Sequence, residues 1–352
     1  MIYLDSAATT FQKPPAVGRA MTEALASMSS PGRGGHPLAM RAADTAFRCR
    51  TELAELFGLD GPEGVAFTLN ATHALNIAIK SLVPPGGRVV ISGYEHNAVT
   101  RPLADIPELR LRVVRAPMFC PDLFLEALEH QLNRGVDVVI CTHVSNVFGY
   151  ALPVEEVANL CRQRQVPLIV DASQSAGVLP VTMQAWGAAF VAMPGHKSLY
   201  GPQGTGLLLC REGGEPLLRG GTGSLSRQPE MPDFLPDRLE AGTHNVPGAA
   251  GLLEGLRFLR RRGIAAIRRQ ETALVAQLAR GLDQVYAAWE KGCQTGVLSF
   301  RVAHRDPGWV ADALSQRGVA VRAGLHCAPL AHATGGTEAT GTVRVSVSAF
   351  NT

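Results

Sequence analysis

Short apolar runs alternate with amphipathic stretches through the middle of the chain. The runs have the length and composition of strands buried on both faces of a sheet, and the stretches between them repeat their apolar positions with a helical period. This alternation over residues 60–210 predicts an α/β domain with a mainly parallel sheet. The predicted strands span 65–69, 88–92, 111–115, 136–141, 166–170 and 188–193, and the predicted helices 15–29, 41–57, 70–82, 122–132 and 154–164.

The pattern changes after residue 210. Residues 211–248 are rich in Gly, Pro and Arg and lack periodicity, which indicates loops. Beyond them we predict helices at 250–260, 264–289 and 309–316, and strands at 297–302, 319–322 and 343–347. We therefore predict a large domain formed by residues 14–248, and a smaller α+β domain formed by residues 1–13 and 249–352.

Composition narrows the class of protein. Of 352 residues, 46% are hydrophobic and 18% charged, and the net charge of +3 comes without any basic run, so we expect no nucleic-acid or membrane surface. The opening MIYLDSAATT lacks the cationic and apolar regions of a secretory signal. The seven cysteines include no C-x-x-C pair, and the histidines show no metal-ligand spacing, so we expect a cytoplasmic protein without a bound metal.

Polar residues follow the ends of three predicted strands. Lys197 comes just after the strand at 188–193, Asp171 ends the strand before it, and His96 follows the strand at 88–92. Ligands of open α/β sheets bind at the carboxyl ends of the strands. A lysine held near apolar walls is a nucleophile that can form a Schiff base, and a Lys with an Asp is the pyridoxal phosphate arrangement. Taken singly, each residue is also compatible with an ordinary loop position.

Two further segments carry candidate chemistry. Asn70 or Thr72 can cap the helix at 70–82, and a helix N-terminus suits a phosphate, although an ordinary capped helix fits this segment equally well. Cys327 follows His326 in a Gly-containing loop, where a neighbouring cation would lower the thiol pKa. The alternative for Cys327 is a plain buried cysteine.

Eight segments in order along nearly the whole chain resemble one family. The chain is similar to the cysteine desulfurases of the class V aminotransferases, which have the fold-type I α/β fold and use pyridoxal phosphate, and within them to the short-loop group that includes selenocysteine lyases. The segments are YLDSAATT, YEHNAV, HVSNVFG, VDASQSAG, PGHKSLYGPQGTG, LEAGTHNVPG, RAGLHCAPL and VRVSVSAFNT.

The resemblance implies a role for each matching residue. In the cofactor site, Lys197 would attach the cofactor, Asp171 would pair with its pyridine nitrogen, Gln174 would bond its phenolic oxygen, and His96 would stack on the ring and handle protons. Thr72, Ala71 and His196 would surround the phosphate, and Gly242 and Thr243 would reach the phosphate of a second subunit in a homodimer. Asn146 would orient the substrate, Arg344 and Arg322 would hold its carboxylate, and Arg33 and His36 would border the site.

The implied reaction removes sulfur from L-cysteine, releases L-alanine and leaves a persulfide on Cys327, from which an unidentified protein accepts sulfur. Selenocysteine lyase or another C–S lyase is the alternative, and a non-enzymatic protein that keeps the fold is a further one. The sequence departs from the family where Ala71 and Pro194 replace hydroxyl residues of the phosphate site, where His73 replaces an acid, and where Leu325 replaces a histidine before the cysteine. Relatives usually continue beyond Thr352 into a terminal helix.

Overall fold

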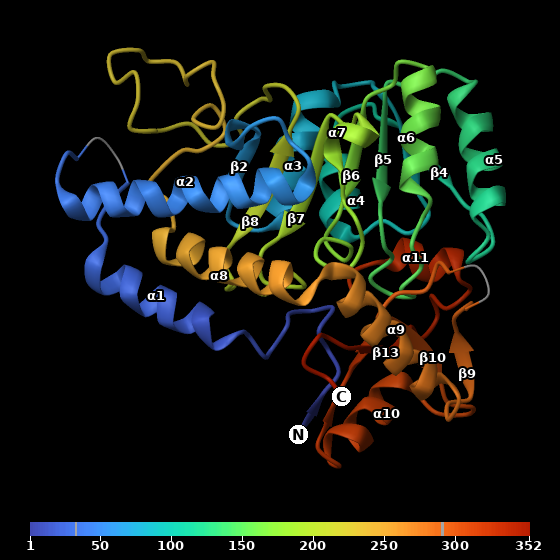
Figure 1. The fold of residues 1–352 in the computed structure, drawn as a ribbon. Coiled ribbons are helices and arrows are strands. Elements are labelled where there is room, and N and C mark those ends of the chain that lie inside the picture. Colours follow the sequence, from blue (N-terminus) through green and yellow to red (C-terminus); the bar gives the residue numbers. More distant parts are fainter. Residues whose placement is uncertain (32–33, 290–291) are drawn as a thin grey trace.

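A central sheet organises the larger part of the molecule. The computed structural model describes residues 1–31, 34–289 and 292–352, and in these residues seven strands form one sheet in the order β2-β8-β7-β6-β5-β3-β4 (Figure 1). Strand β8 is antiparallel to both of its neighbours, and the other pairs are parallel. The predicted mainly parallel α/β sheet is thereby confirmed. The strands are β2 (Val65–Thr68), β3 (Arg88–Ser92), β4 (Arg110–Val114), β5 (Val138–Thr142), β6 (Leu168–Asp171), β7 (Phe190–Pro194) and β8 (Gly206–Cys210).

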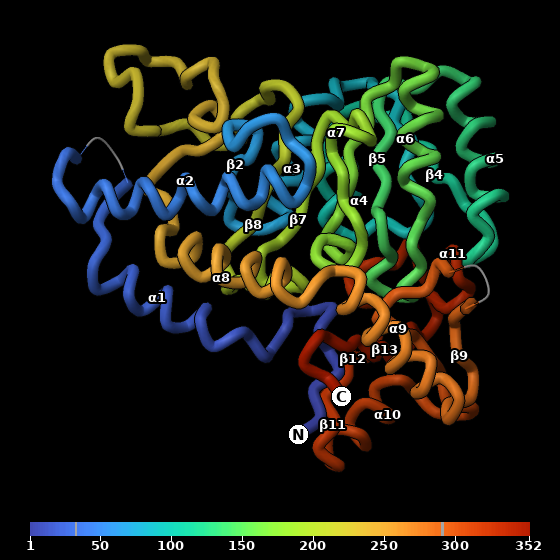
Figure 2. The backbone as a smooth tube through the Cα atoms, viewed as in Figure 1, coloured from blue at the N-terminus to red at the C-terminus, as the bar shows by residue number. Residues whose placement is uncertain are grey.

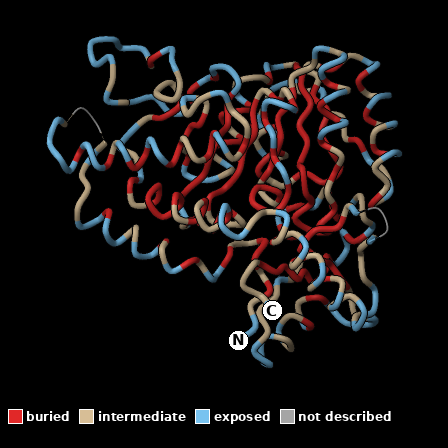
Figure 3. Tube along the Cα trace, viewed as in Figure 1, coloured by how far each residue is buried: buried red, intermediate tan, exposed pale blue. Residues whose placement is uncertain are grey.

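Helices cover both faces of this sheet and bury its apolar side chains (Figures 1 and 3). One core includes Leu53, Phe124 and Leu256, and the other includes Leu75 and Val99, all of them buried. Fully burying a side chain of this size contributes about 1.5–3 kcal/mol, so the two cores hold the rim of the sheet in place. The first core is covered by α2 (Pro37–Phe57), α5 (Pro121–Leu132), α6 (Val154–Gln163), α7 (Met183–Trp186) and α8 (Val246–Arg262), with α1 (Pro15–Ser27) packed on α8; the second is covered by α3 (Ala71–Leu82) and α4 (Asn97–Ala104).

A smaller antiparallel sheet has its own core, which includes Leu4, Leu298 and Val343. The first strand of the chain lies among these C-terminal elements, as Figure 2 shows, because it pairs in parallel with β11. The boundaries predicted for the two domains stay a prediction. The elements here are β1 (Ile2–Tyr3), α9 (Ile264–Ala279), β9 (Gln284–Tyr286), β10 (Val297–Arg301), α10 (Pro307–Ser315), β11 (Val319–Ala320), β12 (Arg322–Gly324) and β13 (Thr342–Ser346), and the sheet order is β12-β13-β10-β9, with β1 and β11 as a separate pair. Helix α11 (Pro329–Thr334) instead packs into the cores of the large sheet.

Several elements differ from the prediction, among them the strand predicted for 319–322, which is divided between β11 and β12 of different sheets. The helix predicted for 264–289 ends at Ala279, and residues Gln284–Tyr286 instead form β9 on β10, because pairing with a neighbouring strand outweighs the helical pattern beyond Gly281. Strand β8 was not predicted, because the glycines before it hide its apolar run. Helix α4 was not predicted, because it is short and contains Pro102.

The carboxyl ends of six strands lie at one rim of the large sheet. Strands β3, β4, β5, β6 and β7 run in parallel, and β2 runs the same way because β2 and β7 are both antiparallel to β8. Helix α3 therefore starts at this rim. Gly206 makes this possible, since a Cβ at this position would lie 2.4 Å from the main-chain carbon of Asn70, the residue that caps α3.

Candidate active site

An open cavity of about 540 Å³ lies at this rim. It brings together eight of the residues predicted for the site, namely Lys197, Asp171, Gln174, His96, Thr72, Ala71, His196 and Asn146. It also includes residues that sequence reasoning missed: Ala98, Thr142, Val144 and Ser173. Their position within or beside the predicted strand-end segments was the available signal.

Lys197 and Asp171 face the same cavity from adjacent strands. Burial lowers the pKa of Lys197 to about 8, although the Asp171 carboxylate opposes this shift. Asp171 is 3% exposed, and its Oδ1 accepts a hydrogen bond from the Ser173 N–H at 2.9 Å. Near neutral pH a useful fraction of the Lys197 amine is therefore unprotonated and nucleophilic, beside a carboxylate that can accept a further N–H.

His96 enters the cavity as the N-cap of α4. Its Nδ1 accepts the Ala98 N–H at 3.0 Å, which places the ring proton of the neutral imidazole on Nε2. Burial lowers the pKa of His96 to about 4; Asp171 opposes the shift and Lys197 adds to it. His96 is thus a neutral imidazole at pH 7 with one N–H to offer.

The start of α3 offers donors for an anion. Asn70 Oδ1 accepts the His73 N–H at 2.9 Å, while the N–H groups of Ala71 and Thr72 lie in the first turn, where a helix supplies no partner. Across the cavity, His196 Nδ1 lies 3.0 Å from Thr9 Oγ1. Burial lowers the pKa of His196 to about 4, with Lys197 and Lys13 adding to the shift. An anion bound at the start of α3 would therefore contact the neutral His196 imidazole and the free backbone N–H groups of the helix.

Arg344 lies on the smaller sheet and contacts Asn146, one of the residues that line the cavity. It is 2% exposed, its Nη2 lies 2.7 Å from Asp5 Oδ1, and its Nη1 donates to the Asn146 carbonyl at 3.1 Å. The Arg344 Nε–H is buried without an acceptor in the part of the chain that the structure describes. Arg322, the second predicted carboxylate ligand, is exposed on β12, in register with Arg344 on β13.

Cys327 sits in an exposed turn that is tied to the cavity. Its carbonyl accepts the Asn97 N–H at 2.8 Å, next to His96, and Asn146 Nδ2 donates to the His326 carbonyl at 2.8 Å. Both turn residues are left-handed, with φ of +49° at His326 and +56° at Cys327, a conformation that costs roughly 1–2 kcal/mol per residue outside glycine. The backbone of the turn is therefore strained, and hydrogen bonds from the start of α4 and from the loop after β5 hold it in place.

The histidine beside Cys327 is not the cation that the sequence predicted. The sequence suggested that His326 supplies a neighbouring cation, but the His326 ring is buried and its Nε2 lies 3.2 Å from the Thr342 carbonyl. Burial, with Arg344 and His332 nearby, holds the pKa of His326 far below its usual value. His326 is therefore uncharged at neutral pH and cannot favour the thiolate by its charge.

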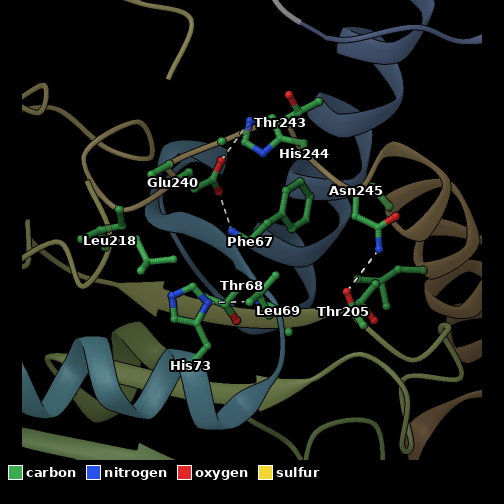
Figure 4. A pocket seen from close by; sticks show the side chains of 17 residues that line it. Phe67, Thr68, Leu69, His73, Thr205, Leu218, Glu240, Thr243, His244 and Asn245 are labelled. Atoms are coloured by element: carbon green, nitrogen blue, oxygen red, sulfur yellow. Dashed lines mark hydrogen bonds and ion pairs between the residues drawn. The ribbon is translucent and has the colours of Figure 1, made fainter. Parts of the chain in front are cut away.

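Three further predicted site residues do not line this cavity. Gly242 and Thr243 line a second open cavity of about 700 Å³ together with Phe67, His73 and Glu240 (Figure 4). His36 caps α2, where its Nδ1 accepts the Ala39 N–H at 3.4 Å, and it does not line the Lys197 cavity. Arg33 falls outside the described residues. The roles of these four stay predictions.

A buried acid beneath the cavity was missed altogether. Glu95 is fully buried, and its Oε1 accepts hydrogen bonds from the Ser92 hydroxyl at 2.5 Å and from the Thr142 N–H at 2.7 Å. Burial raises the pKa of Glu95 to about 8; the Ser92 bond opposes this, and the nearby Asp171 carboxylate adds to it. Glu95 is therefore protonated at neutral pH and adds no second negative charge below Asp171.

This assignment predicts a pH-dependent stability difference between wild type and Glu95→Gln. A pKa raised on folding stabilises the fold below the unfolded pKa, and that stabilisation is lost as the pH rises through about 8. Relative to Glu95→Gln, we expect wild type to lose about 1.4 kcal/mol of unfolding free energy per pH unit between pH 5 and 8. Urea unfolding of the two cofactor-free proteins at several pH values measures this difference in unfolding free energy. The exposed Glu156→Gln serves as control, and a difference that stays flat with pH would refute the assignment.

Other classes of site find no support in the described part of the chain. No helix there is long and apolar enough to cross a membrane. Among the same residues, no group of three His, Cys, Asp or Glu side chains could hold a metal ion.

Comparison with known proteins places the chain. The sequence model of the aminotransferase class-V family matches residues 2–352. A probable cysteine desulfurase of Methanothermobacter thermautotrophicus is 33% identical, with 100% of this chain and 91% of the relative covered. A probable cysteine desulfurase of Mycolicibacterium paratuberculosis is also 33% identical over all of this chain, which spans 53% of that longer relative.

Solved structures agree. The apo cysteine desulfurase of Thermococcus onnurineus superposes with a TM-score of 0.92 at 32% identity and covers 100% of this chain and 90% of that one. The cysteine desulfurase CsdA of Escherichia coli, in an S-sulfonic acid form, superposes with a TM-score of 0.85 at 26% identity. The match covers 99% of this chain and 90% of that one. The family match over almost the whole sequence and the shared fold show that this chain belongs to the aminotransferase class-V family.

Proposed function

We propose that this protein is a pyridoxal phosphate-dependent cysteine desulfurase, which converts L-cysteine to L-alanine and takes the sulfur onto Cys327. The observation that carries the proposal is the main-chain hydrogen bond from Asn97 to Cys327, because it ties the segment of an exposed thiol to His96, which lines the cavity with Lys197 and Asp171. The names of the relatives support the same reaction, although the chain spans about half the length of one of them.

The donor set of the cavity fits the cofactor. Lys197 would attach it, Asp171 would accept the pyridinium N–H, and the start of α3 with Thr72 and His196 would hold the phosphate. Ala71 and Pro194 line the cavity without offering a hydroxyl, so the helix N–H groups take a larger share of phosphate binding. Gln174 already donates Nε2 to the Ala7 carbonyl at 2.9 Å, which leaves one N–H for the ring oxygen.

When bound, pyridoxal phosphate stabilises negative charge at the substrate Cα. The Lys197 amine, with its pKa near 8, accepts the Cα proton as general base. Arg344 and Asn146 orient the substrate, and Cys327 Sγ attacks the substrate sulfur as a thiolate. A sulfur–sulfur bond forms while the Cβ–S bond breaks, and its electron pair stays on carbon, which is then protonated to give the methyl group of alanine.

A homodimer belongs to the same proposal. Gly242 and Thr243 lie away from the Lys197 cavity of their own chain, as expected if they serve a partner's phosphate. Leu38, Met40 and Phe47 on α2 are exposed apolar side chains that a second subunit could cover. A cytoplasmic location and a separate sulfur-acceptor protein complete the proposal.

The test is the product balance with L-cysteine under a reducing thiol. We expect equal amounts of alanine and sulfide from wild type, and a loss of roughly 10²-fold or more in Cys327→Ser, which keeps the size of the side chain but not its nucleophilicity. Cys120→Ser, a half-buried cysteine at the start of α5, should keep wild-type activity. Undiminished alanine formation in Cys327→Ser would contradict the proposal. If Cys327→Ser loses activity with L-cysteine but keeps full activity with L-selenocysteine, the result would favour a selenocysteine lyase.

A further inference from the structure

The N-terminal segment contributes an acid to the site that the family comparison did not assign. Asp5 Oδ1 lies 2.7 Å from Arg344 Nη2, although 339 residues separate the two in the sequence. The Arg344 side chain is 3% exposed and that of Asp5 20%. A guanidinium buried to this degree needs a counter-charge, and Asp5 is the acidic side chain that forms an ion pair with it in the described residues.

Hydrogen bonds fix the position of Asp5 from both sides. Towards the smaller sheet, Leu4 N–H donates to the Ala320 carbonyl at 2.8 Å, and Ala7 N–H donates to Ser346 Oγ at 2.8 Å. Asp5 itself forms a bridge with Ser346, two residues beyond Arg344 on the same strand. The acid and the guanidinium are therefore held by adjacent stretches of extended backbone, which sets their separation.

The same segment continues to the other side of the cavity. The Ala7 carbonyl accepts Gln174 Nε2 at 2.9 Å, and Thr10 Oγ1 donates to the carbonyls of His196 at 3.0 Å and Lys197 at 3.1 Å. The backbone from Asp5 to Thr10 thus spans from the arginine to the lysine. Figure 2 shows this part of the trace leaving the smaller sheet and running towards α1.

The donors left on Arg344 define what it can still bind. Asp5 takes an Nη2–H and the Asn146 carbonyl takes an Nη1–H, while the buried Nε–H has no acceptor in the described residues. An incoming carboxylate would supply that acceptor and would form a charge-assisted bond to a group that is already oriented. Without Asp5, the long side chain would have to be ordered at the moment of binding, and this lowers affinity.

We propose that Asp5 is a positioning residue that holds Arg344 ready for the α-carboxylate of the substrate. The inference rests on the proposed function only for the identity of Arg344 as the carboxylate ligand. It does not depend on sulfur chemistry, so it applies to any α-amino acid that enters the cavity.

The experiment compares two ligands that differ only by a carboxylate, L-alanine and ethylamine. Their binding to the holoenzyme is followed by the change in absorption of the bound cofactor. In Asp5→Ala we expect L-alanine affinity to fall about tenfold or more while ethylamine affinity stays within about twofold. Asp5→Asn keeps an oxygen acceptor at the same place and should recover most of the loss. With L-cysteine, KM should rise in Asp5→Ala while kcat changes little.

Tyr3→Phe is the matched control, because the Tyr3 hydroxyl donates to the carbonyls of Asp5 and Thr9 and so steadies the segment without altering the carboxylate. An equal loss of both ligands in Asp5→Ala, an unchanged affinity for L-alanine, or the same loss in Tyr3→Phe would overturn the proposal. If Asp5→Ala does not fold, Asp5→Asn decides by the same ratio of the two affinities, with a weaker but still carboxylate-specific loss expected. Should wild type release no sulfide from L-cysteine while the ratio changes as expected, the desulfurase assignment fails and this inference stands.

Discussion

Replacing Lys197 by alanine is expected to reduce alanine formation from L-cysteine by roughly 10³-fold or more and to abolish covalent retention of the cofactor. The reason is that Lys197 is the amine that lines the cavity, and burial lowers its pKa to about 8, so that it can serve both as nucleophile and as base. The phosphate-binding end of the cavity is untouched by the change, so non-covalent binding of the cofactor should persist.

Reduction with borohydride makes the link between amine and cofactor permanent, and peptide mapping then identifies the lysine. The sequence has four lysines, which keeps the map simple. Lys13→Ala is a demanding control, since burial also lowers the pKa of Lys13 to about 8 and its Nζ donates to the His196 carbonyl at 2.6 Å. Label on Lys13 in wild type, or full activity in Lys197→Ala, would show that the wrong amine has been assigned.

Glu240→Ala is expected to destabilise the fold by about 3–5 kcal/mol. Glu240 forms a two-pronged ion pair with Arg50, with distances of 2.7 and 2.6 Å, and both residues are buried. Glu240 also accepts the Phe67 N–H at 2.5 Å (Figure 4). Arg50 lies over the Phe67 ring, 4.1 Å from its centroid. Removing the acid leaves a buried guanidinium without a counter-charge and a backbone N–H without an acceptor. Removing one partner of a buried ion pair in this way destabilises a protein more than replacing both partners by apolar residues.

Urea unfolding of the cofactor-free protein measures this loss. Asp137→Ala is the matched control, because Arg88 and Asp137 form an ion pair of the same length, 2.6 Å, with side chains 43% and 36% exposed. Exposed pairs contribute about 0–1 kcal/mol, so this variant should remain close to wild type. The double variant Arg50→Met, Glu240→Leu should recover much of the stability. Equal effects in Glu240→Ala and Asp137→Ala would show that burial does not set the energy of these pairs.

The alternation of apolar and amphipathic segments was sufficient to predict the large sheet, because parallel strands buried on both faces leave a strong local pattern. The rim followed from it, since Asp171 and Lys197 stand at strand ends and the direction of parallel strands fixes where those ends lie. Strand β9 could not be predicted, because its three residues gain their stability from pairing with β10.

The roles of Asp5 and Glu95 were missed because they arise from contacts distant in sequence or from burial. Asp5 acquires its partner across the whole length of the chain, and Glu95 becomes a neutral acid only because the folded sheet removes it from water. The same burial leaves His326 uncharged, which the adjacency of His326 and Cys327 in sequence could not reveal. A pattern along one chain reports neither kind of effect.

The length of the stretch from Asp5 to Thr10 is itself a feature of the site. One end is anchored beside the guanidinium of Arg344 and the other on the carbonyls of His196 and Lys197. The distance between the Arg344 guanidinium and the Lys197 backbone therefore depends on the number of residues in this stretch, and not only on which side chains it carries. Substitutions within residues 5–10 can leave this length unchanged. A single insertion or deletion there would change it even if every functional side chain were preserved.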